Sequence, residues 1–226
     1  MRLAASIDGW QFVTVRHGVK VMKRFLGAGP FVSDKDSQRG EKHICVKSFG
    51  LIDAPPEAVF QMFIDKSRVK EYNEHIVEMD DRKTFPVVSN PISGLKHWTK
   101  LTWTSTPSYG PFKPRDFFSV VHYRSYRDGS YVIVNRPAYH SSDKALSEGS
   151  KKKSGNQKYV RATILLAGNI IKPVKGDKNK SYLTMIAHVN PGGGADTRTG
   201  AFFANKFCAA APPTFIRKLE AAAKKI

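Results

Sequence analysis

The stretch PRDFFSVVHYRSY, residues 114–126, predicts a β-strand that is apolar on both faces. Successive side chains of a strand point to opposite sides. One side would carry Phe117, Ser119, Val121 and Tyr123, and the other Phe118, Val120 and His122. The run SYVIVNR (130–136) follows an Asp-Gly turn signal, so the two runs predict a hairpin. Since neither face is plainly polar, each side of this hairpin requires a cover.

The flanking sequence predicts an α+β fold. Similar runs predict strands at residues 9–15, 18–25, 43–52, 76–85, 96–105, 160–171 and 182–189. Pro55 and Pro56 open one helix, because a first turn tolerates proline, and Ser67 caps a short second one. The chain ends in a long helix that Pro212 and Pro213 must kink. A long antiparallel sheet with this helix lying across it would enclose an apolar cavity.

Chain length and composition predict one domain, and the sequence shows no motif for catalysis. The 226 residues, 41% of them hydrophobic, can bury a core without a disulfide or metal, and we expect a single domain over residues 1–226. Cys45 and Cys208 fit no metal spacing and are interpreted as reduced thiols. The seven histidines form no ligand cluster, and no nucleophile motif is present. We therefore expect no cofactor, no metal and no enzymatic activity.

The net charge of +18 attracts any polyanion, nucleic acid or an anionic membrane surface alike, while solvated loops that keep the protein soluble are the alternative interpretation. The lysines gather at residues 151–153, 172–180 and 217–225, and the serine- and lysine-rich residues 141–158 predict a mobile loop. A nucleic-acid site would interleave basic with aromatic residues, which these runs do not. We therefore expect transient contact with anionic membranes and no nucleic acid, although a basic nucleic-acid-binding module stays the alternative.

The expected location follows from two further features. No apolar run approaches the ~20 residues of a membrane-spanning helix. The first residues also lack the apolar stretch of a signal peptide. We therefore expect a soluble cytoplasmic protein that is peripheral to membranes.

Five segments resemble, in order, landmarks of the START family, the steroidogenic-acute-regulatory-related lipid transfer domains. They are LIDAPPEAVFQMFID (51–65), EYNEHIVEM (71–79), PRDFFSVVHY (114–123), YVRATILLAGNIIKP (159–173) and HVNPGGG (188–194). The pattern is nearest to the phosphatidylcholine-transfer members. The resemblance implies a helix-grip fold, a curved antiparallel sheet around a kinked C-terminal helix, and a monomer with one glycerophospholipid in an internal tunnel. A sensor of sterol or another lipid is the alternative.

Departures from the family pattern bear on the headgroup. The family's Trp-Asp pair is replaced by Tyr72 and Asn73, and Val121 stands where sterol-binding relatives bury an arginine. The resemblance places Phe117 at one aromatic position of a choline cage. Trp103 would lie near a second, and Leu165 at a third.

These considerations give the expected site residues. The lipid-binding set is Tyr72, Asn73, Trp103, Phe117, Ser119, Val121, Tyr123, Leu165, Met185, Phe203 and Phe207. The expected gate and membrane contact comprise Tyr109 and Phe112 in segment 106–114, with Lys218, Lys224 and Lys225 at the helix tip. We interpret Arg115 and Asp116 as a structural pair that fixes the start of the hairpin.

Overall fold

The computed structural model describes residues 6, 8–26, 42–90, 95–110, 112–138 and 159–226. The predicted loop at 141–158 lies outside them. The strands are β1 (Gln11–Arg16), β2 (Val19–Phe25), β3 (Ile44–Ile52), β4 (Glu78–Thr84), β5 (Val88–Asn90), β6 (Leu95–Thr106), β7 (Arg115–Ser125), β8 (Tyr131–Pro137), β9 (Val160–Val174) and β10 (Asp177–Asn190). The helical elements are α3 (Pro56–Ile64), η1 (Lys66–Arg68), α4 (Val69–Tyr72), η2 (Gly193–Asp196), α6 (Arg198–Ala210) and α7 (Pro212–Ala223).

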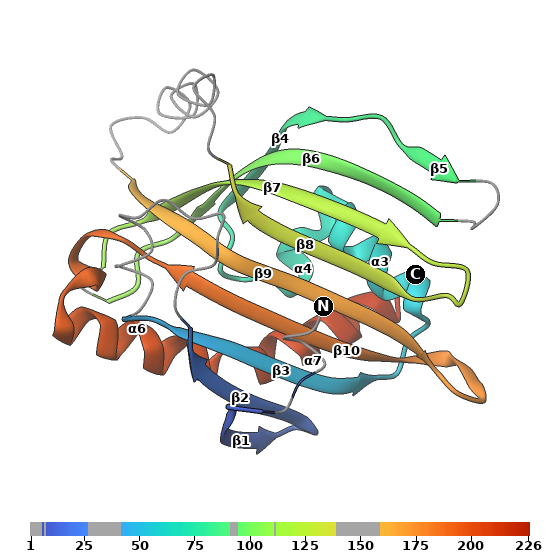
Figure 1. Ribbon diagram of the computed structural model, residues 1–226, viewed down its shortest axis with the longest axis horizontal. Helices are drawn as coiled ribbons and strands as arrows, with labels where there is room; N and C mark the ends of the chain where they lie inside the picture. The colour runs from blue at the N-terminus through green and yellow to red at the C-terminus, as the bar shows by residue number, and fades with distance from the viewer. Residues whose placement is uncertain (1–5, 7, 27–41, 91–94, 111, 139–158) are drawn as a thin grey trace.

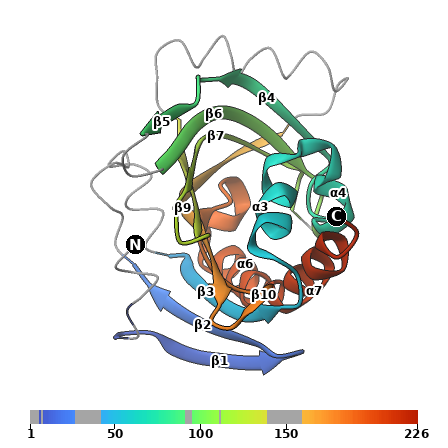
Figure 2. The ribbon, with the colours of Figure 1, turned by 90° about the vertical axis from the view of Figure 1, so that its right-hand side faces the viewer.

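The strands form one curved sheet in the order β1-β2-β3-β10-β9-β8-β7-β6-β4, with β5 paired to β6 (Figure 1). Neighbours are antiparallel, while the start of β7 also pairs in parallel with the start of β9. The sheet wraps around α3, α6 and α7 (Figure 2). This architecture confirms the expected helix-grip fold.

The hairpin that raised the question of a cover is β7–β8, and both of its faces are covered. Tyr123 and Phe118 are both buried although they point to opposite sides of β7. On the side of Tyr123 lies Phe60 of α3, with ring centroids 6.3 Å apart. Phe60 also stacks on Tyr131 of β8 at 4.2 Å. We call this side of the sheet its helix-facing side.

The two short helical elements after β3 begin as the sequence predicts, with one correction. Pro56 occupies the first turn of α3, where its missing N–H costs no hydrogen bond. The next turn, η1, is capped by Asp65, whose Oδ1 accepts from Ser67 N at 2.9 Å. The predicted cap, Ser67, was wrong by two residues, because an aspartate oxygen reaches the same free N–H groups.

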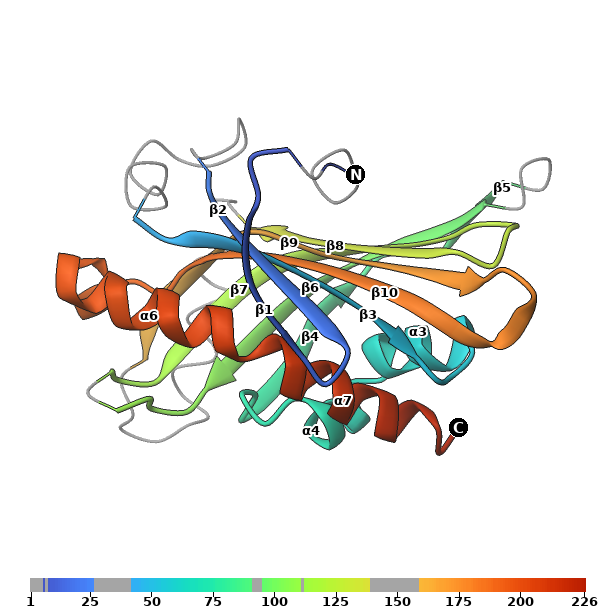
Figure 3. The same ribbon diagram turned by 90° about the horizontal axis from the view of Figure 1, so that it is seen from below.

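The C-terminal helix is bent at the prolines into α6 and α7, and Ala211 between them keeps a right-handed helical conformation (Figure 3). The two halves are packed very differently. α7 buries Ile216, Leu219, Ala222 and Ala223, whereas α6 buries only Gly200 and Ala201. The difference leaves α6 as the loosely packed half of the helix.

A glycine turn connects β10 to α6. The Oδ1 of Asn190 accepts from Gly192 N at 2.9 Å, and Gly192 has a φ of +66°. A Cβ at this position would lie 2.6 Å from the Arg161 carbonyl oxygen, so no other residue fits without a shift. Thr197 then caps α6, its Oγ1 accepting from Gly200 N at 3.0 Å. The turn thus sets the direction in which α6 leaves the sheet.

Candidate functional site

The helix α6 separates two hollows, and we call the one between α6 and the start of β7 the inner cavity. It measures about 510 Å³. It lies between α6, the start of β7, the end of β10 and the segment after β6. Its lining residues are His43, Ile44, His75, Thr106, Tyr109, Gly110, Phe112, Arg115, Phe117, Val189, Pro191, Ala195, Phe203, Ala204, Asn205, Phe207 and Cys208. Cavities of this size and apolar character are typical ligand sites.

An aromatic cluster closes one side of the inner cavity. Tyr109 Oη lies 2.8 Å from His75 Nδ1. The Phe207 ring of α6 lies 5.0 Å from the Tyr109 ring and 5.3 Å from the His75 ring, centroid to centroid. Edge and tilted contacts at such distances are favourable for aromatic pairs. The cluster therefore holds α6 against the segment that follows β6.

That segment turns sharply at its tip. Tyr109 N donates to Phe112 O at 3.1 Å, and Phe112 N donates to Tyr109 O at 3.0 Å. Gly110 has a φ of +55° in this turn, a conformation that glycine adopts without strain. The reciprocal pair fixes both aromatic side chains on the cavity.

Arg115 is a buried cation on the cavity wall, 5% exposed. Its Nε donates to the Pro191 carbonyl at 3.2 Å, and its Nη1 donates to the Lys113 carbonyl. The guanidinium also lies 5.1 Å from the centroid of the Phe112 ring. Within the described residues it has no carboxylate partner, and loss of hydration lowers its pKa. A buried guanidinium held by carbonyls alone can accept an anionic group from a ligand.

The expected Arg115–Asp116 pair is not formed, because the two side chains point to opposite sides of β7. Asp116 instead accepts two hydrogen bonds from Arg161 of β9, at 2.9 and 2.7 Å. It also accepts from Trp103 Nε1 at 3.0 Å. Asp116 therefore connects β6, β7 and β9 on the side away from the helices, while the Arg115 side chain lines the inner cavity.

Two histidines on the cavity wall are held neutral by burial. His43 is 2% exposed, and burial lowers its pKa although Asp196 Oδ1, 3.4 Å away, acts in the other direction. Burial likewise lowers the pKa of His75, against the opposing effect of Glu74. Neutral imidazoles keep this part of the wall compatible with an apolar ligand.

Asn205 fastens α6 to the beginning of β3. Its Oδ1 accepts from Ile44 N at 2.9 Å, and its Nδ2 donates to the Lys42 carbonyl at 3.0 Å. The amide thereby satisfies backbone groups that the sheet leaves unpaired. It forms the wall between the inner cavity and the second hollow.

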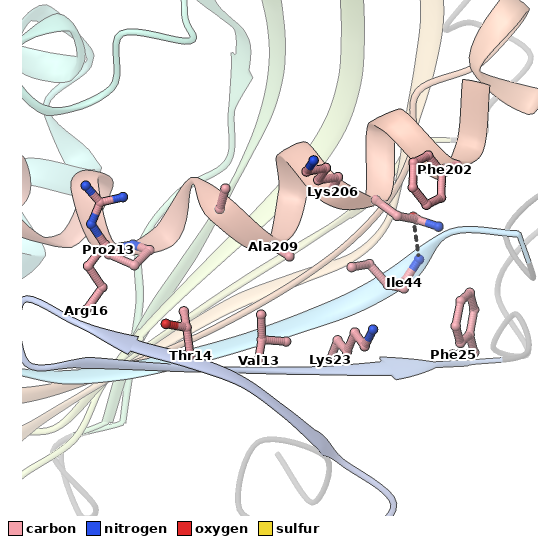
Figure 4. A pocket seen from close by; sticks show the side chains of 12 residues that line it. Val13, Thr14, Arg16, Lys23, Phe25, Ile44, Phe202, Lys206, Ala209 and Pro213 are labelled. Atoms are coloured by element: carbon pink, nitrogen blue, oxygen red, sulfur yellow. Dashed lines mark hydrogen bonds between the residues drawn. The ribbon is translucent and has the colours of Figure 1, made fainter. Parts of the chain in front are cut away.

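The second hollow, which we call the outer groove, lies between α6 and the β1–β2 hairpin (Figure 4). It measures about 580 Å³. Its lining residues are Val13, Thr14, Arg16, Lys23, Phe25, Ile44, Phe202, Asn205, Lys206, Ala209, Ala210 and Pro213. Ile44 and Asn205 thus line both hollows.

Five predicted site residues meet at the inner cavity. Phe117 comes from β7, and Phe203 and Phe207 come from α6. The predicted gate residues Tyr109 and Phe112 lie on the same cavity. Their place on its wall makes them candidates for lipid contact.

Other predicted residues lie on the helix-facing side but deeper, where α3 and α7 fill the space. Val121, Tyr123 and Tyr72 belong to the hydrophobic core, with Met185 packed against it. Tyr72 lies 5.5 Å from Phe215 of α7, ring to ring. These four do not line either hollow, since helix side chains fill the space that the sequence assigned to a tunnel.

The remaining predicted wall residues also lie apart from both hollows. Trp103 and Phe118 are opposite one another in the β6–β7 register, so Trp103 lies on the side away from the helices. Leu165 is buried at a shift in the β9–β10 register. Ser119 is buried opposite Thr102, and Asn73 Oδ1 accepts from His75 N at 3.2 Å.

The far end of α7, which Lys224 and Lys225 follow, lies next to α3 and α4 rather than at the inner cavity (Figure 3). Lys218 lies in the middle of α7, and besides burial its charge contributes to lowering the pKa of His75 on the cavity wall. Lys218 forms an ion pair with Glu74, and Lys224 Nζ lies 2.6 Å from Asp53 Oδ2. Lys225 follows at the exposed end. We therefore assign the cover of the cavity to α6.

The sequence interpretation did not include His43, His75, Asn205 or the groove cations among site residues. Apart from His75, none of them stands in a recognisable motif. His75 alone carried a signal, because it lies in the segment EYNEHIVEM that resembles a family landmark. Within the described residues no group of His, Cys, Asp and Glu could hold a metal, and no helix is long and apolar enough to cross a membrane.

Comparisons with known proteins agree with this architecture. The family model for the START domain matches residues 5–197. Human STARD10 is 19% identical with a TM-score of 0.70, over 99% of this chain and 76% of that one. Human StAR-related lipid transfer protein 5 is 17% identical with a TM-score of 0.70, over 99% and 90%. The lipid transfer and protein localization domain of human StarD13 (DLC2) is 16% identical with a TM-score of 0.65, over 100% and 94%. The search of curated proteins gives no match.

Proposed function

The chain belongs to the START domain family, and from this premise we propose that it binds one lipid in the inner cavity and carries it between membranes. The observation that carries the proposal is the apolar cavity of about 510 Å³ beneath α6. Apolar surface on a ligand would gain roughly 25 cal/mol for each Å² that it buries there. No covalent step is required of the protein, which acts as a monomeric carrier.

We propose a glycerophospholipid as the ligand, because the wall carries one buried cation. Arg115 has carbonyl partners but no carboxylate among the described residues, and its pKa is lowered by desolvation. A phosphate oxygen beside the guanidinium would supply the missing negative charge through a charge-assisted hydrogen bond. Phe112, Phe117 and Phe203 would surround the adjoining glycerol and acyl groups.

Release of such a lipid requires α6 to move. This helix buries only two residues fully, and it is held by Asn205, by the Phe207 cluster and by the packing of Cys208 and Ala209 against the core. Segments with few buried apolar contacts open at low free energy. We propose that α6 and the Tyr109–Phe112 turn part to admit and release the lipid, and that the protein acts peripherally at membranes.

Native mass spectrometry of protein purified from cells tests the proposal directly. We expect one bound lipid per chain, and extraction of labelled phospholipid from liposomes by the lipid-free protein. A spectrum with only the mass of the bare chain, together with no extraction, would show that this protein is not a lipid carrier.

The role of Arg115 has its own matched test. Arg115→Met should lower the binding of phosphatidylcholine by roughly tenfold, the loss expected for one charge-assisted hydrogen bond. Diacylglycerol lacks the phosphate and serves as the control ligand, whose binding should change little. An equal loss of both ligands would assign Arg115 to the scaffold alone.

A further inference from the structure

The outer groove combines apolar walls with cations from three elements. Arg16 comes from β1, Lys23 from β2 and Lys206 from α6, so they converge only in the folded chain. No Asp or Glu from the part of the chain that the structure describes lines the groove. Among the described residues, none of these three cations forms an ion pair. An unpaired group of three cations on one surface attracts anions.

Two aromatic side chains stand at one end of the groove. Phe25 is 58% exposed and Phe202 is 65% exposed. Figure 4 shows them at the opposite end from Arg16, with Lys23 and Lys206 between. Exposed aromatic rings beside cations are typical of surfaces that enter the headgroup layer of a membrane, where rings meet acyl chains and cations meet phosphates.

We propose that the outer groove is a docking site for the headgroups of anionic phospholipids at a bilayer surface. The phosphate groups lie against Arg16, Lys23 and Lys206, and the rings of Phe25 and Phe202 enter the acyl boundary. The charge complementarity selects anionic over zwitterionic lipid. The site is separate from the inner cavity and does not depend on which lipid that cavity carries.

The position of the groove gives docking a consequence for α6. Asn205 and Ile44 line both hollows, and Lys206 and Phe202 project from the same helix as the cavity residues Phe203 and Phe207. A membrane that occupies the groove therefore touches the helix that covers the inner cavity. Docking thus places that cavity next to the donor or acceptor bilayer.

Vesicle sedimentation with matched charge variants tests the proposal. The probes are phosphatidylcholine vesicles with and without phosphatidylserine. One variant combines Arg16→Gln, Lys23→Gln and Lys206→Gln. The control combines Lys172→Gln, Lys175→Gln and Lys178→Gln, which removes three exposed charges elsewhere. Each cation at an anionic surface contributes roughly fivefold in affinity. We expect the groove variant to lose at least about tenfold in affinity for anionic vesicles, and the control to lose much less.

A second pair separates aromatic insertion from charge. Phe202→Ala should weaken the binding to anionic vesicles that persists when salt screens the cations. Phe12→Ala is the control, because Phe12 is 60% exposed but does not line the groove. Melting curves confirm that each variant is folded, and native mass spectrometry confirms that lipid loading is retained.

Three results would overturn the docking site. Equal losses of affinity in the groove variant and the control variant would mean that the net charge of the protein, and not the groove, attracts the membrane. Unchanged binding of the groove variant would exclude the groove. Concentration-dependent dimerisation that the groove variant abolishes would assign the groove to a second copy of the chain. A protein that docks on vesicles but never carries lipid would leave this site standing and defeat only the carrier function.

Discussion

The inner cavity and the outer groove share one helix, yet their chemistry is opposite. The spacing of four residues puts Phe203 and Phe207 on the inner side of α6, while Phe202 and Lys206 lie on the outer side. The inner cavity holds its one guanidinium buried among carbonyls. The outer groove presents its three cations with no carboxylate from the described residues beside them.

This difference teaches how one basic protein can offer two kinds of lipid contact. A cation that stays near water keeps most of its hydration and is available to many anions, but weakly. A buried cation has lost that hydration and gains more from a single well-placed anion. The inner cavity is therefore suited to one specific ligand, and the outer groove to a fluctuating surface of many headgroups.

The largest expected effect comes from filling each hollow with the same side chain. Ala204→Trp places an indole in the inner cavity and should abolish lipid loading, a loss of at least about tenfold, because a filled site cannot take the ligand. Ala210→Trp, on the same helix, fills the outer groove instead and should leave loading intact while reducing binding to anionic vesicles. Native mass spectrometry and vesicle sedimentation measure the two effects. An equal loss of lipid loading in both variants would contradict the assignment of separate roles to the inner cavity and the outer groove.

A smaller effect is expected where the two hollows meet. Asn205→Ala removes both hydrogen bonds to the start of β3 and leaves Ile44 N without its partner, at a cost of about 1–3 kcal/mol. Because α6 has few other contacts, we expect faster amide exchange in α6 and a lipid release rate raised several-fold. Asn179→Ala, at the exposed start of β10, is the control. Unchanged α6 exchange in Asn205→Ala would show that other contacts hold this helix.

Acid should weaken the inner region and spare the outer one. The pKa values of His43 and His75 are lowered by burial from about 6.5, so in the range below 6.5 the unfolded chain binds protons that the folded chain does not. Stability should therefore fall as pH drops from about 7 to 5, by a few degrees in Tm. His122, whose pKa burial also lowers, adds to this slope.

Matched measurements identify the source of that acid sensitivity. His75→Gln should flatten part of the dependence of Tm on pH. Vesicle docking should change little over the same range, because lysine and arginine stay charged. A Tm that rises on acidification would contradict the sign of this prediction.

The smallest effect is expected at the paired lysines on and just after α7. Lys218 and Lys224 are exposed and already paired with Glu74 and Asp53. Replacing both lysines by Gln should change vesicle binding by less than about twofold, since exposed ion pairs contribute little. The sedimentation assay used for the groove variant measures this variant too. A loss as large as that of the groove variant would move the docking surface to these lysines.

Local patterns predicted much of the fold. The alternation of residues 114–126 and the Asp-Gly turn signal gave the β7–β8 hairpin, and the proline pair gave the bend between α6 and α7. These features depend on neighbours in the chain, whose geometry is set by backbone sterics and side-chain alternation. The five landmarks in order then gave the family, which matches residues 5–197.

The candidate site was predicted only in part. Side-chain alternation tells which side of a strand a residue lies on, but not whether that residue lines the cavity or is buried in the core. Phe117 and Val121 share one side of β7, yet Phe117 reaches the cavity while Val121 belongs to the hydrophobic core. The position of Trp103 follows only from the β6–β7 register, which places it opposite Phe118, on the side of the sheet away from the helices. Both outcomes depend on contacts between segments far apart in sequence.

By itself, therefore, the sequence determined every strand except β5 (Val88–Asn90), together with the bent helix and the family, since each rests on local pattern or ordered motifs. Only the tertiary structure decided that α6 rather than the end of α7 covers a cavity, and that Arg115 faces that cavity without Asp116. It alone brought Arg16, Lys23 and Lys206 from three elements to one groove. The physical reason is that register, packing and the convergence of charges arise from long-range contacts, which no single segment of the chain encodes.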